Sequence, residues 1–216
     1  MLTITNVSCQ RGYKRLFEPV SFSLRLGQAL HLEGDNGVGK TSLLRIICGL
    51  SPADSGELLW NGNPLNKHHP EVITDFRASL CYVGHNLSLK DDLTAIENLL
   101  LDAQVAGNKL SYHLAIAALQ KIGLHKQASL PLKVLSQGQK RRMALARLFI
   151  THAKLWVLDE PFVALDTPSL ENLRLLLLQH VQQDGMLIFT SHQSVKLFLP
   201  HEHAIDVQNL RMAAAL

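Results

Sequence analysis

The sequence GDNGVGKT occupies residues 34–41 and decides the fold. It matches the pattern G-x-x-x-x-G-K-[ST], in which glycines let the backbone curl so that successive N–H groups point at phosphate oxygens. Residues 29–33 before it are mostly apolar and of strand length, and residues 42–50 after it have the apolar spacing of a helix. This order favours a phosphate-binding loop over a glycine turn with an incidental lysine.

Each end of this loop has an expected part in binding a triphosphate. The Lys40 ammonium reaches the β- and γ-phosphates, and the Thr41 hydroxyl is an Mg²⁺ ligand. The start of the following helix adds its positive end to the same anion site. The expected nucleotide contacts are Gly34, Asp35, Asn36, Gly37, Val38, Gly39, Lys40, Thr41 and Ser42.

A second motif is LWVLDEP, at residues 155–161. An acidic residue at the end of a buried apolar strand is costly unless a cation receives it. We therefore expect Asp159 to hold the Mg²⁺ of the phosphate site, and Glu160 to act as the general base that orients the attacking water. The alternative is that both carboxylates only cap the turn after the strand, which the phosphate-binding loop disfavours.

The apolar pattern along the chain predicts an α/β fold. LWVLD and MLIFTS are near-continuous apolar runs, typical of parallel strands buried on both faces, and a helix near residues 169–182 separates them. Between about residues 93 and 150 the apolar residues fall at helical spacing. We expect one domain over residues 1–216, with a mixed-sheet core at 1–90 and 151–216 and an inserted helical subdomain at 91–150.

Composition and charge bear on whether the chain binds a nucleic acid or inserts into a membrane. The chain has 216 residues, 47% of them hydrophobic and 18% charged, and a formal net charge of +3. Such a chain can build a core, and the charge is too small to argue for a nucleic acid. The richest apolar stretch, LRLLLLQHV, is far shorter than the roughly 20 residues that a membrane span needs. We expect no direct membrane insertion.

A third motif, LSQGQKRRMALARL at residues 135–148, resembles the signature sequence of ATP-binding cassette (ABC) ATPases. Ser136 can cap the helix that follows, and Gly138 permits close approach of the backbone to a phosphate. The resemblance implies a P-loop NTPase core of the ABC type and ATP as the nucleotide. It also implies a homodimer that sandwiches two ATP molecules, each contacted by Ser136, Gly138 and Gln139 of the opposite chain. Without the resemblance, residues 140–142 would be the solvated face of a basic helix or a nucleic-acid patch.

Further landmarks follow the ABC pattern. Residues 164–166 (ALD) resemble the loop that crosses the dimer interface, and His192 resembles the switch histidine that contacts the γ-phosphate. Tyr13 is the candidate for stacking on adenine, although the register leaves Arg11 open for this place.

Two positions depart from the ABC pattern. His85 stands where a glutamine usually joins the core to the helical insertion, and Gln137 stands where a second glycine is common. We expect His85 to contribute to catalysis by contacting a water or a phosphate, with the alternative that it is a packing or docking residue. An imidazole, unlike a glutamine side chain, changes its charge near neutral pH.

The combination of YVGH, LTAIENL, LDEPF and TSHQ is similar to the ATP-binding subunits of the ABC complexes for cytochrome c biogenesis. This resemblance implies a peripheral protein on the cytoplasmic face of the bacterial inner membrane, with integral membrane subunits as partners and ATP hydrolysis coupled to haem export or delivery. An ABC transporter with another cargo shares the same catalytic residues. A soluble, non-transport ABC ATPase is expected to carry two cassettes or long coiled coils, and a non-hydrolysing regulator is disfavoured by Lys40, Asp159, Glu160 and His192.

Overall fold

The structure is a computed structural model that describes residues 1–191 and 206–215. Two compact units divide the chain: Met1–Gly84, Ala153–Glu160 and His180–Leu216 form the first, and His85–His152 and Pro161–Gln179 form the second. The strands are β1 (Leu2–Ser8), β2 (Gln10–Arg11), β3 (Lys14–Arg15), β4 (Val20–Leu24), β5 (Gln28–Glu33), β6 (Ser55–Trp60), β7 (Asn63–Pro64), β8 (Leu80–Val83), β9 (Leu155–Leu158), β10 (Met186–Thr190) and β11 (Asp206–Arg211). The helices are α1 (Lys40–Ile47), α2 (Pro70–Ala78), α3 (Ala95–Val105), α4 (Tyr112–Lys121), α5 (Gln137–Ala146) and α6 (Thr167–Gln182), with short 3₁₀ turns at His125–Gln127, Leu132–Val134 and Arg147–Phe149.

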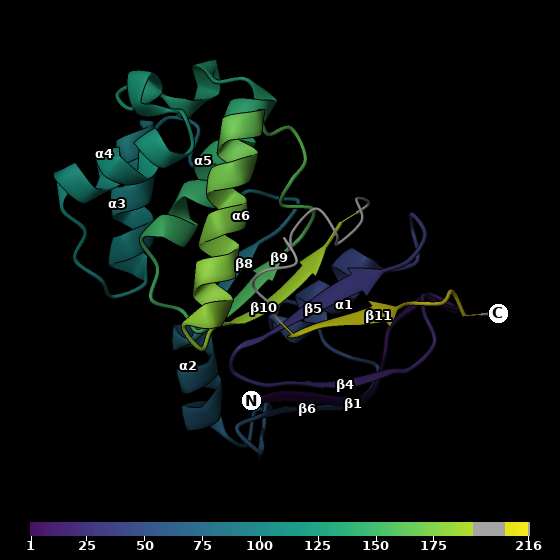
Figure 1. Cartoon of the computed structure of the whole chain (residues 1–216). Coiled ribbons are helices and arrows are strands. Elements are labelled where there is room, and N and C mark those ends of the chain that lie inside the picture. The colour runs from purple at the N-terminus through teal and green to yellow at the C-terminus, as the bar shows by residue number, and fades with distance from the viewer. Residues whose placement is uncertain (192–205, 216) are drawn as a thin grey trace. The chain divides into compact units, whose positions relative to one another are not determined.

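The first unit is built on a parallel sheet of five strands in the order β11-β5-β10-β9-β8 (Figure 1). Every residue of β9 and β10 is buried, which is why both segments are apolar without alternation. The parallel pairing of β9 with β10 confirms the prediction that LWVLD and MLIFTS form strands of a parallel sheet, and it shows that they are neighbours. Because parallel strands end at one edge, the residues that directly follow β5 and β9 lie on the same side of the sheet as the last residue of β10.

A second sheet in the same unit is antiparallel, in the order β4-β1-β6-β7, so the two sheets together give the mixed α/β fold that the sequence predicts. Helix α1 contributes Leu43, Leu44, Ile46 and Ile47 to a core shared with both sheets. This buried face holds the N-terminal end of α1, and with it the preceding loop, against the parallel sheet.

The second unit is helical. It contains α3, α4 and α5 around a buried cluster that includes Ile96, Leu99, Leu119 and Met143, and residues 167–179 of α6 belong to it. The prediction placed residues 161–179 with the core, whereas here they group with the helices. The exact domain boundaries stay a prediction.

Several elements were not predicted or differ in extent. Helix α1 begins at Lys40, two residues before the predicted start, and ends at Ile47. Helix α2 and the four-residue strand β8 were not predicted, and both precede the second unit in the chain. Within residues 1–191 and 206–215, no helix combines the length and the apolar character needed to cross a membrane.

One half-buried histidine links the end of α6 to strand β9. The ring of His180 stacks on Trp156 with centroids 3.7 Å apart and 6° between the planes. Its Nε2 lies 3.2 Å from the Met186 carbonyl oxygen, and because a carbonyl only accepts, this nitrogen carries the proton and donates. Burial, helped by the nearby Lys154, lowers the pKa of His180 from 6.5 to about 4.

This lowered pKa predicts an acid-sensitive fold. The unfolded chain binds a proton at His180 below about pH 6.5, whereas the folded chain does so only below about pH 4. The stabilisation is therefore complete above pH 6.5 and lost as the pH falls toward 4, by roughly 1 kcal/mol per pH unit. The free energy of unfolding, measured with urea at several pH values between 7.5 and 4.5, should fall less steeply with falling pH in His180→Gln than in the control His125→Gln, whose histidine is exposed. Equal slopes against pH in the two variants would contradict the lowered pKa of His180.

Candidate active site

The phosphate-binding loop, residues 34–41, joins the end of β5 to the start of α1 in the first unit. Gly39 caps the helix with a φ of 103°, a backbone conformation that residues with a side chain rarely adopt. A Cβ at this position would also lie 2.7 Å from Cδ1 of Phe17. Conformation and space therefore both require glycine directly before Lys40.

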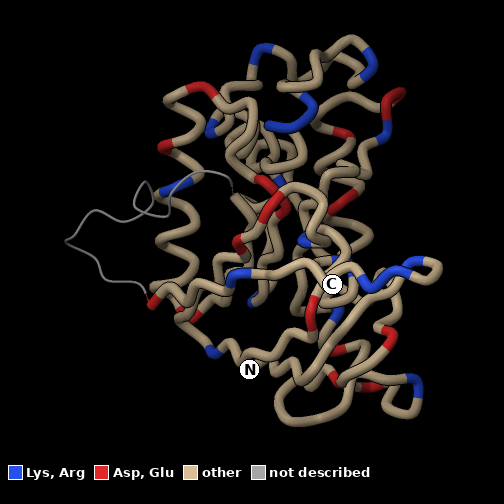
Figure 2. Tube along the Cα trace, turned by 90° about the vertical axis from the view of Figure 1, so that its right-hand side faces the viewer, with Lys and Arg blue, Asp and Glu red and all other residues tan. Residues whose placement is uncertain are grey.

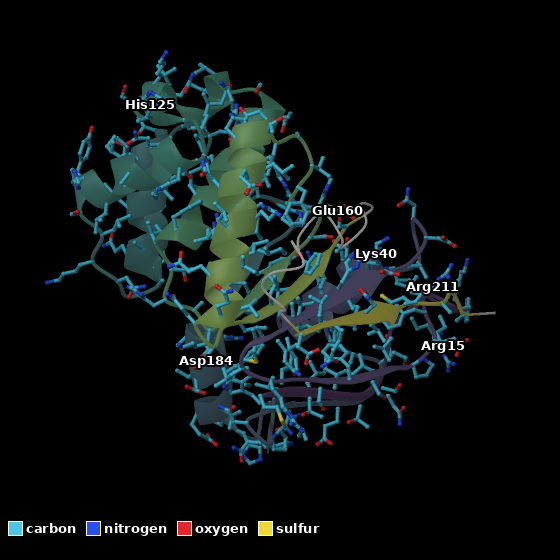
Figure 3. The ribbon with its side chains drawn as sticks, viewed as in Figure 1. Arg15, Lys40, His125, Glu160, Asp184 and Arg211 are labelled. Carbon is cyan, nitrogen blue, oxygen red and sulfur yellow. The ribbon has the colours of Figure 1, made fainter. Side chains whose placement is uncertain are left out.

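Lys40 is buried, with 8% of its surface exposed, although it carries a charge. Its Nζ donates to the carbonyl oxygens of Gly34 at 2.6 Å and of Asp35 at 3.3 Å. The ammonium thus lies against the carbonyls of its own loop, near the start of α1, where Figure 3 labels Lys40. A glycine-rich loop of this kind directs its N–H groups at an anion. A buried ammonium with carbonyl partners only is placed to exchange them for phosphate oxygens.

Asp159 follows the last residue of β9 and is 4% exposed. Its Oδ2 accepts a hydrogen bond from the Thr41 hydroxyl at 2.7 Å, and its backbone N–H donates to the Val83 carbonyl at 2.9 Å. The structure therefore brings together the two residues that the sequence analysis proposed as Mg²⁺ ligands. A buried carboxylate beside a hydroxyl is an oxygen donor set of the kind that Mg²⁺ prefers, so these residues fit the metal.

Glu160 adopts a φ of 52°, in the left-handed region that favours glycine. Its backbone N–H donates to Oγ1 of Thr190, the last residue of β10, at 2.8 Å. The same hydroxyl donates to Oδ1 of Asp159 at 2.8 Å. The sequence alone does not predict a role for Thr190, because a threonine that ends an apolar strand carries no local signal of a role in a site.

The predicted adenine contact lies on a short hairpin of the first unit. Tyr13 is fully exposed in the turn between β2 and β3, where Arg11 pairs with Lys14. Leu16 and Phe17 follow this hairpin and lie beside Gly39, because a Cβ added there would meet their side chains at 3.3 and 2.7 Å. An exposed aromatic ring on a turn that precedes these residues suits stacking on a base, and Arg11, also exposed, stays the alternative.

The signature segment begins helix α5 in the second unit. Ser136 caps the helix by accepting from the Gln139 backbone N–H at 3.2 Å, and the Gln139 side chain accepts from the Ser136 N–H at 2.9 Å. A Cβ on Gly138 would meet only ordinary contacts with Ala164, at 3.6 and 3.7 Å. Nothing within the second unit therefore excludes a side chain at Gly138, which is consistent with a ligand or partner approaching there.

Two of the three basic residues of α5, Lys140 and Arg142, form ion pairs inside the second unit. Lys140 binds Asp91 at 2.7 Å, and Arg142 binds Asp166 at 3.0 Å. Asp166 also accepts from the Ser169 N–H at the start of α6, and hydrogen bonding by the Ser169 side chain and by this N–H lowers the pKa of the Asp166 carboxyl group. Figure 2 shows Lys and Arg interspersed with Asp and Glu over the trace. Together with the ion pairs of Lys140 and Arg142, this distribution disfavours the alternative of a basic nucleic-acid patch.

The geometry described for the first unit includes neither of two further predicted residues, His85 and His192. His85 is exposed and begins the second unit directly after Gly84. His192 lies outside the described residues, one residue beyond Ser191. Their roles in catalysis stay predictions.

Comparisons with known proteins agree with one another. The family described as "ABC transporter" matches residues 17–163. The "Cytochrome c biogenesis ATP-binding export protein CcmA" of Nitrosomonas europaea is 47% identical over 195 residues, covering 90% of each chain. The protein of the same name from Dechloromonas aromatica is 47% identical over 197 residues, covering 91% of this chain and 95% of its own.

Solved structures show the same similarity. A dimeric ATP-binding cassette in a post-hydrolysis state, bound to ADP and Pi, aligns with a TM-score of 0.78 and 25% identity over 89% of this chain and 88% of its own. An ABC transporter ATP-binding protein from Pyrococcus furiosus aligns with a TM-score of 0.77 and 25% identity over 97% and 96%.

Proposed function

The chain belongs to the ABC transporter family, and from this premise we propose that it is the ATP-hydrolysing subunit of a membrane complex for cytochrome c biogenesis. The curated relatives at 47% identity carry that process, ATP binding and export in their names, and they cover nine-tenths of the chain. The observation that carries the catalytic part of the proposal is the buried contact between Thr41 and Asp159, because it joins the phosphate-binding loop to the acidic end of β9.

Different residues of the first unit bind the phosphates, hold the metal and activate the water. The loop N–H groups and the Lys40 ammonium bind the β- and γ-phosphates of ATP and orient the γ-phosphorus. Thr41 and Asp159 would hold Mg²⁺, which neutralises charge on the phosphate oxygens when it is bound. Glu160 orients a water molecule on the side of the γ-phosphorus opposite the leaving ADP oxygen. The Glu160 carboxylate accepts a proton from this water as the water oxygen attacks the γ-phosphorus.

The partners of the chain follow from the same proposal. A homodimer would place Ser136, Gly138 and Gln139 of one chain against the ATP held by the other, and the solved neighbour is dimeric. Integral membrane subunits would anchor the dimer at the cytoplasmic face of the inner membrane and carry the haem. Ser136, the N-cap of α5, is exposed, which supports the proposed contact with the ATP of the opposite chain.

A co-purification experiment tests the proposal. The tagged chain, expressed together with its own operon and purified in mild detergent, should retain integral membrane proteins and hydrolyse ATP only with Mg²⁺. Membrane partners that handle another cargo would contradict the assignment to cytochrome c biogenesis while leaving the ATPase intact. A chain that binds no ATP would contradict the whole proposal.

Tyr13→Ala should lower the affinity for ATP by about tenfold, since removing an aromatic stacking partner of a base costs on the order of 1–3 kcal/mol. Tyr13→Phe should retain the affinity, because the hydroxyl is not needed for stacking. Calorimetric titration with ATP distinguishes these variants from Arg11→Gln. A loss in Arg11→Gln with none in Tyr13→Ala would give the adenine contact to Arg11 instead.

A further inference from the structure

Thr190 occupies a position in the site that the proposed mechanism has not used. It is the last residue of β10 and is completely buried, with 0% of its surface exposed. Because β10 pairs with β9 in parallel, with Phe189 opposite Leu158, the next step along both strands places Thr190 beside Asp159. A polar side chain buried at this edge must find its hydrogen-bond partners inside the site.

The hydroxyl of Thr190 both accepts and donates. It accepts from the Glu160 backbone N–H at 2.8 Å and donates to Oδ1 of Asp159 at 2.8 Å. A hydroxyl has a single proton, so the proton that goes to Asp159 is unavailable elsewhere. One side chain thus connects the backbone of the proposed base to the carboxylate of the proposed metal ligand.

The Asp159 carboxylate is held from two directions. Oδ2 accepts from Thr41 at the start of α1, and Oδ1 accepts from Thr190 at the end of β10. Two hydroxyl donors from different elements restrict rotation of the carboxylate about its bond to the main chain. Hydrogen bonds of this kind, one step removed from a metal, orient metal ligands elsewhere.

Glu160 needs the same support for another reason. Its φ of 52° is sparsely populated by residues with a side chain and persists only where the surroundings hold it. The hydrogen bond from its N–H to Thr190 is one such restraint. We infer that Thr190 is a positioning residue, which orients Asp159 toward Mg²⁺ and keeps the Glu160 backbone in the conformation used for hydrolysis; this inference rests on the proposed function.

Thr190→Val separates the hydroxyl from the shape of the side chain. Valine fills the same space but neither donates to Asp159 nor accepts from Glu160. In the full chain we expect ATP affinity measured in EDTA to be unchanged. The increase in affinity on adding Mg²⁺ should fall by about tenfold, and kcat should fall by about 10- to 100-fold.

Thr190→Ser is the conservative variant and should restore both readouts, because it keeps the hydroxyl. Ser8→Ala is the matched control, since Ser8 is also buried and its Oγ lies 2.7 Å from the Ser55 hydroxyl, in the antiparallel sheet. It loses a buried hydroxyl without touching the site, so metal-dependent affinity and kcat per folded molecule should match the wild type.

Thermal unfolding of every variant measures the folded fraction that normalises these values. If Thr190→Val does not fold, Thr190→Cys tests the same point against Thr190→Ser, because cysteine has the shape of serine and its thiol is only a weak hydrogen-bond donor and acceptor. A valine or cysteine variant whose Mg²⁺-dependent affinity and kcat stay within about twofold of Thr190→Ser would overturn the inference, since hydroxyl loss is expected to cost at least tenfold. A wild-type chain without Mg²⁺-dependent ATP binding would overturn the proposed function as well, which distinguishes the two failures.

Discussion

Glu160→Gln is expected to lower ATP turnover by about 10²- to 10⁴-fold while ATP binding persists, because the amide keeps the shape of the carboxylate but accepts no proton from water. The backbone at this position should be undisturbed, since the Glu160 N–H that donates to Thr190 belongs to the main chain. The bound ATP should then accumulate and hold two chains together.

Steady-state phosphate release and size-exclusion chromatography with ATP measure these two effects. Glu57→Gln is the matched control, because Glu57 is an exposed residue of β6 and the substitution removes the same charge. Hydrolysis by Glu160→Gln at a rate close to that of the Glu57 control would remove Glu160 from the role of base.

Lys40→Ala is expected to weaken ATP binding by about two orders of magnitude, because charge-assisted hydrogen bonds are the strongest that the loop makes to phosphate. Turnover should be lost with it. Lys40 is buried, and its Nζ also holds the carbonyls of Gly34 and Asp35, so part of the effect acts through the shape of the empty loop.

Calorimetry with ATP and with adenosine separates the two contributions. The affinity for adenosine, which has no phosphates, should change little, whereas the affinity for ATP should fall steeply. Lys67→Ala, which removes an exposed lysine from the same unit, should behave as the wild type for both. An ATP affinity that survives in Lys40→Ala would contradict the assignment of residues 34–41 as the phosphate-binding loop.

The parts of the site that local sequence predicts are those with a local physical cause. The backbone conformation requires glycines before Lys40, and the carboxylate of Asp159 after a buried apolar strand is costly without a partner. Both motifs can therefore be recognised from the local sequence. The parallel pairing of β9 with β10 follows from their continuous burial.

Other features depend on contacts between distant segments. Thr190 donates a hydrogen bond to Asp159, which lies 31 positions away in the sequence. A single threonine at the end of a strand gives no local indication of such a partner. Strand β8 has only four residues, too few to show a period, and it is specified by pairing with β9. Helix α2 begins at Pro70, and its sparse apolar residues bury little beyond Phe76.

The left-handed backbone at Glu160 sets a limit on engineering this protein. Glycine adopts that conformation at little cost, so a redesign guided by thermostability alone would replace Glu160 with glycine and report an improvement. The same exchange would remove the carboxylate proposed to activate water. Thermal stability and the rate of ATP hydrolysis thus place opposite demands on residue 160. A stabilised variant of this chain has to gain its stability from substitutions at other positions.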